Sequence, residues 1–234
     1  MKEKDFTALV IKPIAYIHTD FPTKFGIPRQ GDVVSSLTGT IVFEEEYRKE
    51  GILRGLEEFS HLWLIWGFSD FESKKEFSPT IRPPKLGGNQ RVGVFASRSP
   101  NRPNPLGISA VKIESIITTG KESPIIKVSG VDLMDKTPIY DIKPYIPYSD
   151  AIMDAKEGYT VYTRNKPLLK VIIPEEVKEK IPSDKLNSLM EVLAQDPRPG
   201  FHHDKDRVYG FAYLDKEIKF HVTEDLTLIV DDIK

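Results

Sequence analysis

The stretch HLWLIWGF, at residues 61–68, decides the fold class of this chain. It is almost wholly apolar and contains both tryptophans, and a run this short suits a buried strand better than a helix. Further short runs rich in β-branched, aliphatic or aromatic residues lie on both sides of it, at 6–11, 14–17, 39–43, 91–96, 108–117, 125–131 and 139–142. The sequence therefore predicts seven or eight strands, with one or two helical turns between residues 44 and 59 and no long helix among them.

The spacing of these strands favours a closed sheet. The connections are short and irregular, which is typical of an antiparallel or mixed barrel rather than of a doubly wound α/β sheet. Pro13 separates the first two runs, since proline cannot donate in a central strand ladder. We therefore expect a mainly β fold built around a small barrel that occupies residues 1–158.

The last third of the chain has a different pattern. Ser183 is a predicted N-cap, and the residues after it place leucine and methionine at helical spacing, at positions 186, 189, 190 and 193. Gln195-Asp196-Pro197 ends this helix, and three short strands are expected at 208–214, 218–222 and 226–230. Residues 159–234 are therefore predicted to form a smaller C-terminal α+β domain.

The composition excludes several classes of protein. The chain of 234 residues has a net charge of -2 and no cysteine, which excludes disulfides, thiolate zinc sites, iron–sulfur clusters and cysteine nucleophiles. No apolar run approaches the roughly 20 residues that a membrane-spanning helix needs. The first residues, MKEKDFTALVIKP, lack the long apolar stretch of a signal peptide, so we expect a cytoplasmic protein without a membrane association.

Positive charge is concentrated in residues 77–113. This segment holds six cations and no Asp or Glu, so its charge is +6 and the rest of the chain carries -8. It also holds six prolines, and they make RSPNRPNPLG at 98–107 a stiff loop rather than a helix or a central strand. Two interpretations stay open from this pattern: a rigid anion-binding loop, or a surface loop whose cations are solvated.

An acidic stretch follows at 130–151. Asp132 and Asp135 flank an expected turn, where carboxylates can accept hydrogen bonds from a ligand or take a proton. Aspartate is equally typical of ordinary turns, so the pattern alone favours a structural role. The tyrosines of this stretch, such as Tyr145, can either stack on a base or lie half-buried in the sheet.

One stretch is far more specific than these patterns. RVGVFASRSPNRPNPLGIS, at 91–109, strongly resembles the signature of the TrmO (YaeB-like, TsaA-like) family of tRNA N6-methyltransferases. Four more stretches agree with it: GIPRQ at 26–30, GLEEFSHLWLIW at 55–66, PTIRPPKLGGN at 79–89 and DLMDKTPIYDIKPYIPY at 132–148. QDPRPG at 195–200 resembles the longer bacterial members. The resemblance is continuous over roughly 9–155 and patchy beyond.

The resemblance implies a β-barrel that binds S-adenosylmethionine, in a homodimer with the cofactor near the subunit interface. It also implies methyl transfer to N6 of N6-threonylcarbamoyladenosine beside the anticodon, so the partner is the anticodon loop of tRNA. By motif position, the implied cofactor-binding residues are Pro28, Arg29, Gln30, Ser69, Asp70, Arg98, Ile108, Ser129, Gly130, Val131 and Asp132. Relatives often carry His-Gln where this chain has Ser69-Asp70, so the cofactor role of this pair is open.

Roles follow from the chemistry of this reaction. Methyl transfer needs mainly alignment of donor and acceptor, and it requires no metal. Arg29 or Arg98 can pair with the carboxylate of the cofactor, Asp132 can accept from its ribose or amino group, and Asp135 is the candidate base. Substrate contacts are expected from Lys85, Arg102 and Tyr145. Two other functions stay open: a non-catalytic RNA-binding barrel, and an S-adenosylmethionine-dependent enzyme acting on a small molecule.

Overall fold

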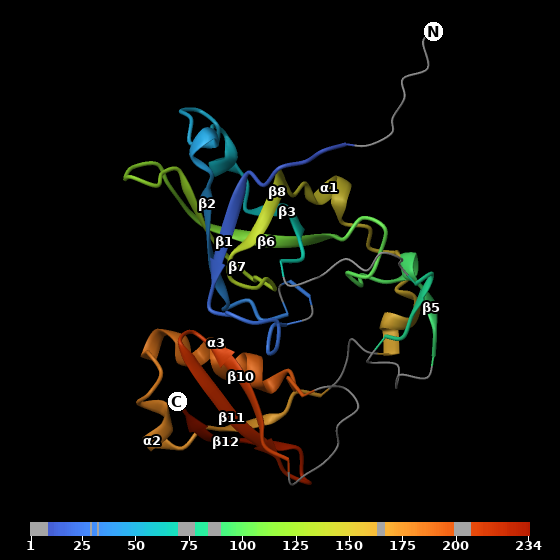
Figure 1. Ribbon diagram of the computed structural model, residues 1–234, viewed down its shortest axis with the longest axis vertical. Helices are drawn as coiled ribbons and strands as arrows, with labels where there is room; N and C mark the ends of the chain where they lie inside the picture. The colour runs from blue at the N-terminus through green and yellow to red at the C-terminus, as the bar shows by residue number, and fades with distance from the viewer. Residues whose placement is uncertain are drawn as a thin grey trace.

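The computed structural model describes residues 9–28, 30–31, 33–69, 78–83, 90–162, 167–198 and 207–234. They form two bodies of structure, a barrel and a smaller C-terminal unit beside one of its ends (Figure 1). Within the described residues no helix is long and apolar enough to cross a membrane.

Six antiparallel strands close the barrel in the order β1-β2-β7-β6-β3-β8. They are β1 (Ala15–Thr19), β2 (Thr38–Phe43), β3 (His61–Gly67), β6 (Leu106–Ile117), β7 (Ile125–Ser129) and β8 (Thr137–Pro144). Because the last strand pairs with the first, this sheet has no free edge. The predicted closed, mainly β architecture is confirmed.

Alternation along the strands creates the barrel core. In β3, Leu62 and Leu64 are fully buried, whereas Trp63 between them lies on the outer face. The other strands contribute the same kind of alternating branched side chains to the interior: Ile17, Ile41, Val111, Ile126, Val128 and Ile139. The core therefore fills the barrel with side chains, and any ligand must bind at an end or on the outside.

Short 3-10 helices and two-residue strands lie in the connections between the barrel strands. The helical turns expected between 44 and 59 are the 3-10 helices η1 (Glu45–Tyr47) and η2 (Leu56–Glu58). The strand expected at 91–96 is wrong in part, because only β5 (Val92–Gly93) is extended, pairing with β4 (Thr80–Ile81), before the 3-10 helix η4 (Val94–Ala96). The part of the expected strand at 6–11 that is described, residues 9–11, is not in a strand, and residues 6–8 lie outside the described residues. Two further turns follow the barrel, α1 (Pro147–Asp150) and η5 (Gly158–Tyr162).

The C-terminal unit is a four-stranded sheet with helices beside it. Its strand order is β10-β11-β12-β9, and its elements are β9 (Lys170–Ile172), α2 (Glu175–Lys178), α3 (Ser183–Ala194), β10 (Tyr209–Tyr213), β11 (Lys216–Val222) and β12 (Thr227–Ile233). Helix α3 buries Leu189 and Leu193, as the spacing predicts. Pro182, not Ser183, is the N-cap, and β9 and α2 were missed because their apolar runs are only a few residues long.

Antiparallel pairing brings loops from distant parts of the chain to one end of the barrel. Strand β1 ends at Thr19, which pairs with Gly39 near the start of β2. Strand β2 begins at Thr38, which pairs with Ser129 at the end of β7. Strand β3 ends at Gly67 opposite Leu106, the first residue of β6. The loops after β1, β3 and β7, and the loop before β6, therefore meet at this end, which is the end nearer to the C-terminal unit (Figure 1).

Candidate functional site

A cavity of about 280 Å³ lies at this end of the barrel. Its walls come from the loop after β1, the end of β3, the proline-rich loop and the segment between β7 and β8. The lining residues are Lys24, Ile27, Pro28, Trp66, Phe68, Ser69, Pro100, Asp132, Leu133, Met134 and Thr137. Mostly apolar walls with a few convergent polar groups are typical of a small-molecule site.

An aromatic wall and a carboxylate are linked by hydrogen bonds in this cavity. The ring of Trp66 packs edge-on against Phe68, with 4.5 Å between ring centroids. Its indole Nε1 donates to Ser109 Oγ at 3.0 Å, and Ser109 Oγ donates to Asp132 Oδ1 at 2.6 Å. These two consecutive hydrogen bonds fix the orientation of the Asp132 carboxylate. Ser109 occupies Oδ1 and makes no bond with Oδ2.

Burial changes the acidity of this carboxylate. Loss of solvation raises the pKa of Asp132 above its usual value. The hydrogen bond from Ser109 and the positive charge of Arg98 act in the opposite direction and are the smaller effects. A half-buried, oriented carboxylate beside aromatic faces is suited to accept hydrogen bonds from a ligand with hydroxyl or amino groups.

Arg98 connects two of the sequence motifs at the site. Its Nη1 donates to Gln30 Oε1 at 2.7 Å, and its charge acts on Asp132. Pro28 is buried in the cavity wall, while Ser69 Oγ lies 3.4 Å from Thr137 Oγ1 on another wall. The structure therefore brings Pro28, Gln30, Ser69, Arg98 and Asp132 together from four separate stretches.

The other implied cofactor residues lie around this group without lining the cavity. Ser129 is buried and donates to Glu114 at 2.5 Å, and Gly130 donates through its backbone to Leu37 O at 2.9 Å. Val131 belongs to the barrel core, whereas Ile108 is 47% exposed on the outer face of β6. Ser129, Gly130 and Val131 directly precede Asp132 in the chain, and Ile108 lies on the opposite face of β6 from Ser109.

The proposed base, Asp135, and the two described substrate residues, Arg102 and Tyr145, also lie outside the cavity lining. Asp135 Oδ1 is 3.2 Å from His18 Nδ1 and accepts from the Thr19 backbone at 3.2 Å. Arg102 donates to the Ser97 carbonyl at 3.0 Å. Tyr145 packs against Trp63, 5.4 Å away, beside a separate cavity on the outer face of the barrel.

Three of the predicted residues, Arg29, Asp70 and Lys85, lie outside the described residues. Among the residues that are described, no group of three or more His, Asp or Glu side chains could hold a metal ion.

Sequence reasoning missed the aromatic wall and the link behind Asp132. Trp66 was counted only as a strand residue, and Ser109 was passed over in favour of its neighbour Ile108. Alternation offers the signal that finds Ser109: it shares the inward face of β6 with Val111, where a hydroxyl needs a partner. No comparable signal distinguishes Thr137 from an ordinary strand residue.

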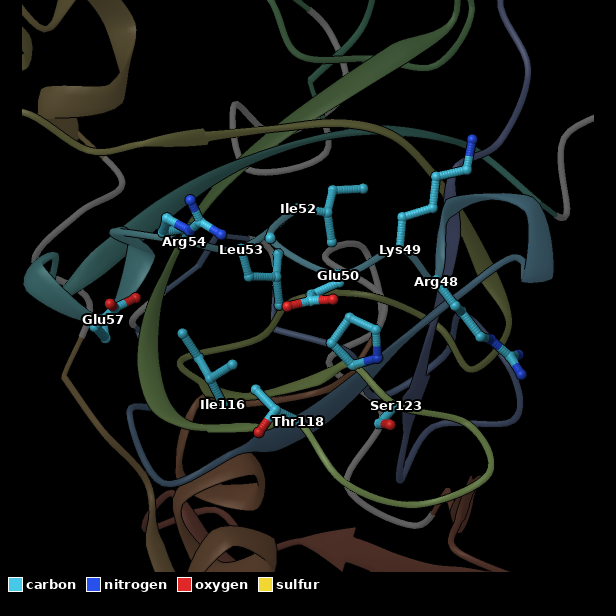
Figure 2. A pocket seen from close by; sticks show the side chains of 12 residues that line it. Arg48, Lys49, Glu50, Ile52, Leu53, Arg54, Glu57, Ile116, Thr118 and Ser123 are labelled. Carbon is cyan, nitrogen blue, oxygen red and sulfur yellow. The ribbon is translucent and has the colours of Figure 1, made fainter.

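A larger cavity, of about 530 Å³, lies at the other end of the barrel between residues 48–57 and the β6–β7 hairpin. Figure 2 shows its cations Arg48, Lys49 and Arg54 spread around the rim, with the apolar side chains of Ile52 and Leu53 between them. Arg48 Nε already donates to the Phe43 carbonyl at 2.8 Å. Among the described residues, none of those implied in cofactor or substrate binding lines this cavity, so the larger volume does not make it the candidate site.

Two family models of known proteins match most of the chain. The tRNA-methyltransferase O N-terminal domain model matches residues 16–151, and the TrmO C-terminal domain model matches residues 166–234. The second match shows that the similarity, expected to be patchy after residue 155, continues to the end of the chain.

Individual relatives are similar over almost the whole chain. The tRNA (adenine(37)-N6)-methyltransferase of Escherichia coli is 36% identical over 218 residues, which are 90% of this chain and 92% of that protein. The "Putative S-adenosylmethionine-dependent methyltransferase RcsF" of Pseudomonas aeruginosa is 36% identical over 231 residues, or 94% of this chain and 96% of that protein. The crystal structure of TrmO from Pseudomonas aeruginosa superposes with a TM-score of 0.77 at 30% identity, covering 97% of this chain and 100% of that one. This chain therefore belongs to the tRNA-methyltransferase O family.

Proposed function

We propose that this protein is an S-adenosylmethionine-dependent tRNA methyltransferase that methylates N6 of N6-threonylcarbamoyladenosine next to the anticodon. The observation that carries the proposal is the cavity in which Trp66, Ser109 and Asp132 form one hydrogen-bonded unit beside Arg98. The name of the Escherichia coli relative supports methylation of N6 of adenine 37 in tRNA, and the name of the RcsF relative supports S-adenosylmethionine as the methyl donor.

The residues present match the chemistry of the cofactor. Asp132 can accept from its hydroxyl or amino groups, Arg98 can pair with its carboxylate, and the faces of Trp66 and Phe68 can contact its purine or its sulfonium. When bound, S-adenosylmethionine supplies a methyl group on a carbon already activated by the adjacent sulfonium. The protein then needs to hold the acceptor nitrogen in line with that carbon and to exclude water.

The acceptor nitrogen loses a proton when it gains the methyl group. Asp135 stays our candidate for the base that takes it. The bond between Asp135 and the Thr19 backbone holds this carboxylate at the same end of the barrel as the cavity. Arg102, Lys85 and Tyr145 remain proposed tRNA contacts, with Arg102 carried by the stiff proline-rich loop.

A homodimer is part of the proposal. Phe95, Leu106 and Ile108, beside the proline-rich loop, are 76%, 39% and 47% exposed and offer an apolar surface for it. We also propose the division into 1–158 and 159–234, because the described strands of the two parts fall into separate sheets.

The function is tested with tRNA that carries or lacks the threonylcarbamoyl group. Incubation with S-adenosylmethionine, followed by mass spectrometry of the nucleosides, should show a methyl gain only on the threonylcarbamoylated tRNA. Cofactor binding without any methyl gain on tRNA would indicate an enzyme acting on a small molecule. Salt-sensitive tRNA binding without cofactor binding would indicate a non-catalytic RNA-binding barrel.

Replacing Arg98 with alanine is expected to weaken S-adenosylmethionine binding about three- to tenfold, because the lost charge is exposed and partly screened. Calorimetry measures this change. Arg91→Ala is the matched control, since Arg91 lies in the same basic segment but donates to Thr80 at 2.9 Å, away from the cavity. Equal affinities for wild type and Arg98→Ala would contradict the role of Arg98 as the anchor of the cofactor carboxylate.

A further inference from the structure

The segment 20–28 lies between the barrel and the C-terminal unit and forms part of the cofactor cavity. It leaves the end of β1 and supplies Lys24, Ile27 and Pro28 to the cavity wall. It contains no helix or strand of its own. Its shape therefore depends on contacts from the two bodies that flank it.

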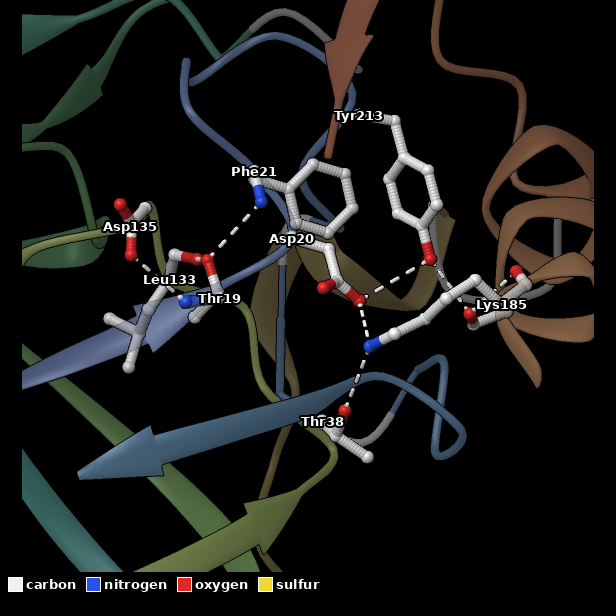
Figure 3. A network of polar contacts seen from close by, with 9 residues as sticks. Thr19, Asp20, Phe21, Thr38, Leu133, Asp135, Lys185 and Tyr213 are labelled. Carbon is white, nitrogen blue, oxygen red and sulfur yellow. Dashed lines mark hydrogen bonds and ion pairs between the residues drawn. The ribbon is translucent and has the colours of Figure 1, made fainter. Parts of the chain in front are cut away.

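The C-terminal unit holds the first residue of this segment at several atoms. Lys185 Nζ of α3 lies 2.6 Å from Asp20 Oδ2, and both side chains are largely withdrawn from water, at 24% and 13% exposure. The hydroxyl of Tyr213 approaches the same oxygen at 3.5 Å, and the backbone of Leu214 donates to Asp20 O at 2.7 Å. Figure 3 shows Asp20 reaching from the barrel towards Lys185 and Tyr213.

Aromatic rings of the C-terminal unit contact two further residues of the segment, Phe21 and Gly26. Tyr213 meets Phe21 edge-on, with 5.4 Å between ring centroids. Phe211 lies so close to Gly26 that a Cβ on this glycine would come within 2.3 Å of the ring. Gly26 also has φ of +92°, a conformation that favours glycine. The β10–β11 hairpin thus fits directly against the backbone of the segment.

The barrel holds the opposite side of the segment. The backbone of Asp135 donates to Phe21 O at 2.8 Å, and Thr19 Oγ1 donates to Leu133 O at 2.9 Å. Leu133 is itself part of the cavity wall. The segment is therefore held between the cavity and the C-terminal unit. A shift of the C-terminal unit would move the residues of this segment that line the cavity.

We propose that Lys185, Phe211 and Tyr213 of the C-terminal unit are positioning residues for the cofactor site, acting through Asp20, Phe21 and Gly26. This inference rests on the proposed cofactor function and adds to it a role for the C-terminal unit. The unit sets the geometry of the wall formed by Lys24, Ile27 and Pro28, so that less ordering is needed when the cofactor binds. Burial raises the pKa of Tyr213 above its usual value, and its hydroxyl also lies 2.7 Å from Ser188 Oγ of α3.

The decisive variant is Lys185→Met combined with Tyr213→Phe in the full chain. It removes the two side-chain partners that Asp20 has among the described residues, together with the 2.7 Å contact of the Tyr213 hydroxyl with Ser188, and it keeps the bulk and the ring contact with Phe21. We expect S-adenosylmethionine to bind about five- to tenfold more weakly, with kcat at saturating cofactor changed less than about twofold. Hydrogen exchange of peptides covering 20–28 should accelerate, while β11 and β12 exchange as in wild type.

Two matched variants separate positioning from general stability. Ser36→Ala removes another bond between the same two bodies, from Ser36 to Glu191 Oε2 at 2.6 Å, but outside the segment, and should leave cofactor affinity unchanged. Lys185→Arg keeps the positive charge opposite Asp20, so this variant should bind S-adenosylmethionine with most of the affinity that the Lys185→Met, Tyr213→Phe variant loses.

The outcomes are distinct. Faster exchange at 20–28 together with weaker cofactor binding supports the inference. Unchanged exchange at 20–28 overturns it whatever the cofactor does, and faster exchange with unchanged affinity overturns the link to the site. Failure of the wild type to bind S-adenosylmethionine overturns the proposed function itself, and the exchange measurement still shows whether the unit holds the segment.

Discussion

The Asp132→Asn variant is expected to bind S-adenosylmethionine about 10- to 100-fold more weakly than the wild type, because it loses a charged acceptor inside a desolvated cavity. The side chain keeps its shape and can still accept from Ser109, which donates to Oδ1 at 2.6 Å in the wild type. The unliganded variant should be at least as stable as the wild type, since a buried charge has been removed. Calorimetry gives the affinity and thermal unfolding gives the stability.

The stability difference between Asp132→Asn and the wild type should depend on pH. The pKa of Asp132 is raised in the folded protein, chiefly by desolvation, so the ionised form costs stability above the folded pKa. This cost disappears as pH falls through the folded pKa towards the unfolded value of about 3.9. The stability advantage of Asp132→Asn should therefore shrink on acidification. Cofactor affinity of the wild type should fall over the same pH range, whereas that of the variant should not.

Asp141→Asn is the matched control for this carboxylate. Asp141 lies on β8 and pairs with Lys143 at 2.9 Å, and it does not line the cavity. Its replacement should change neither the affinity nor its pH dependence. Wild-type affinity in Asp132→Asn would show that the cofactor binds without this carboxylate.

Periodicity was sufficient to predict the barrel because each strand has one buried face. HLWLIWGF at 61–68 forms β3 almost as expected, with leucines inside, and Val111 and Ile126 follow the same alternation. Periodicity failed where elements are too short to show a period, as in β9 and α2. It also failed at 94–96, where a valine and a phenylalanine stand in a 3-10 turn instead of a strand.

The site was only partly predictable, for a reason that lies in the topology. Motif position named Gln30, Arg98 and Asp132, but their proximity depends on barrel closure, which brings loops distant in sequence to one end. Ser109 and Trp66 are the last residues of two of the resembling stretches, but those stretches do not show that the two side chains meet, because their contact depends on the pairing of β3 with β6. The contact of Phe211 in β10 with Gly26 in the loop after β1 joins positions 185 residues apart, and short-range patterns carry no information about it.

Gly107→Ala should strongly damage the site although it adds only one methyl group. Gly107 of β6 lies opposite Trp66 of β3, and a Cβ there would come within 2.3 Å of the indole carbons Cε2 and Cζ2. The indole cannot move away at low cost, because it packs on Phe68 and donates to Ser109. We expect a loss of about 1–3 kcal/mol in the free energy of unfolding and at least a tenfold loss of cofactor affinity.

Gly93→Ala and a double variant identify the cause of that loss. A Cβ at Gly93 meets nothing within 4 Å, so its alanine variant should unfold and bind like the wild type. Trp66→Leu frees the space that the new methyl group needs, so adding Gly107→Ala to it should cost little further stability. Urea unfolding of the four proteins in this Trp66–Gly107 cycle should therefore give a coupling energy of about 1 kcal/mol or more. Additive losses would place the damage in the β6 backbone, and the indole would then not be the part that fixes Ser109 and Asp132.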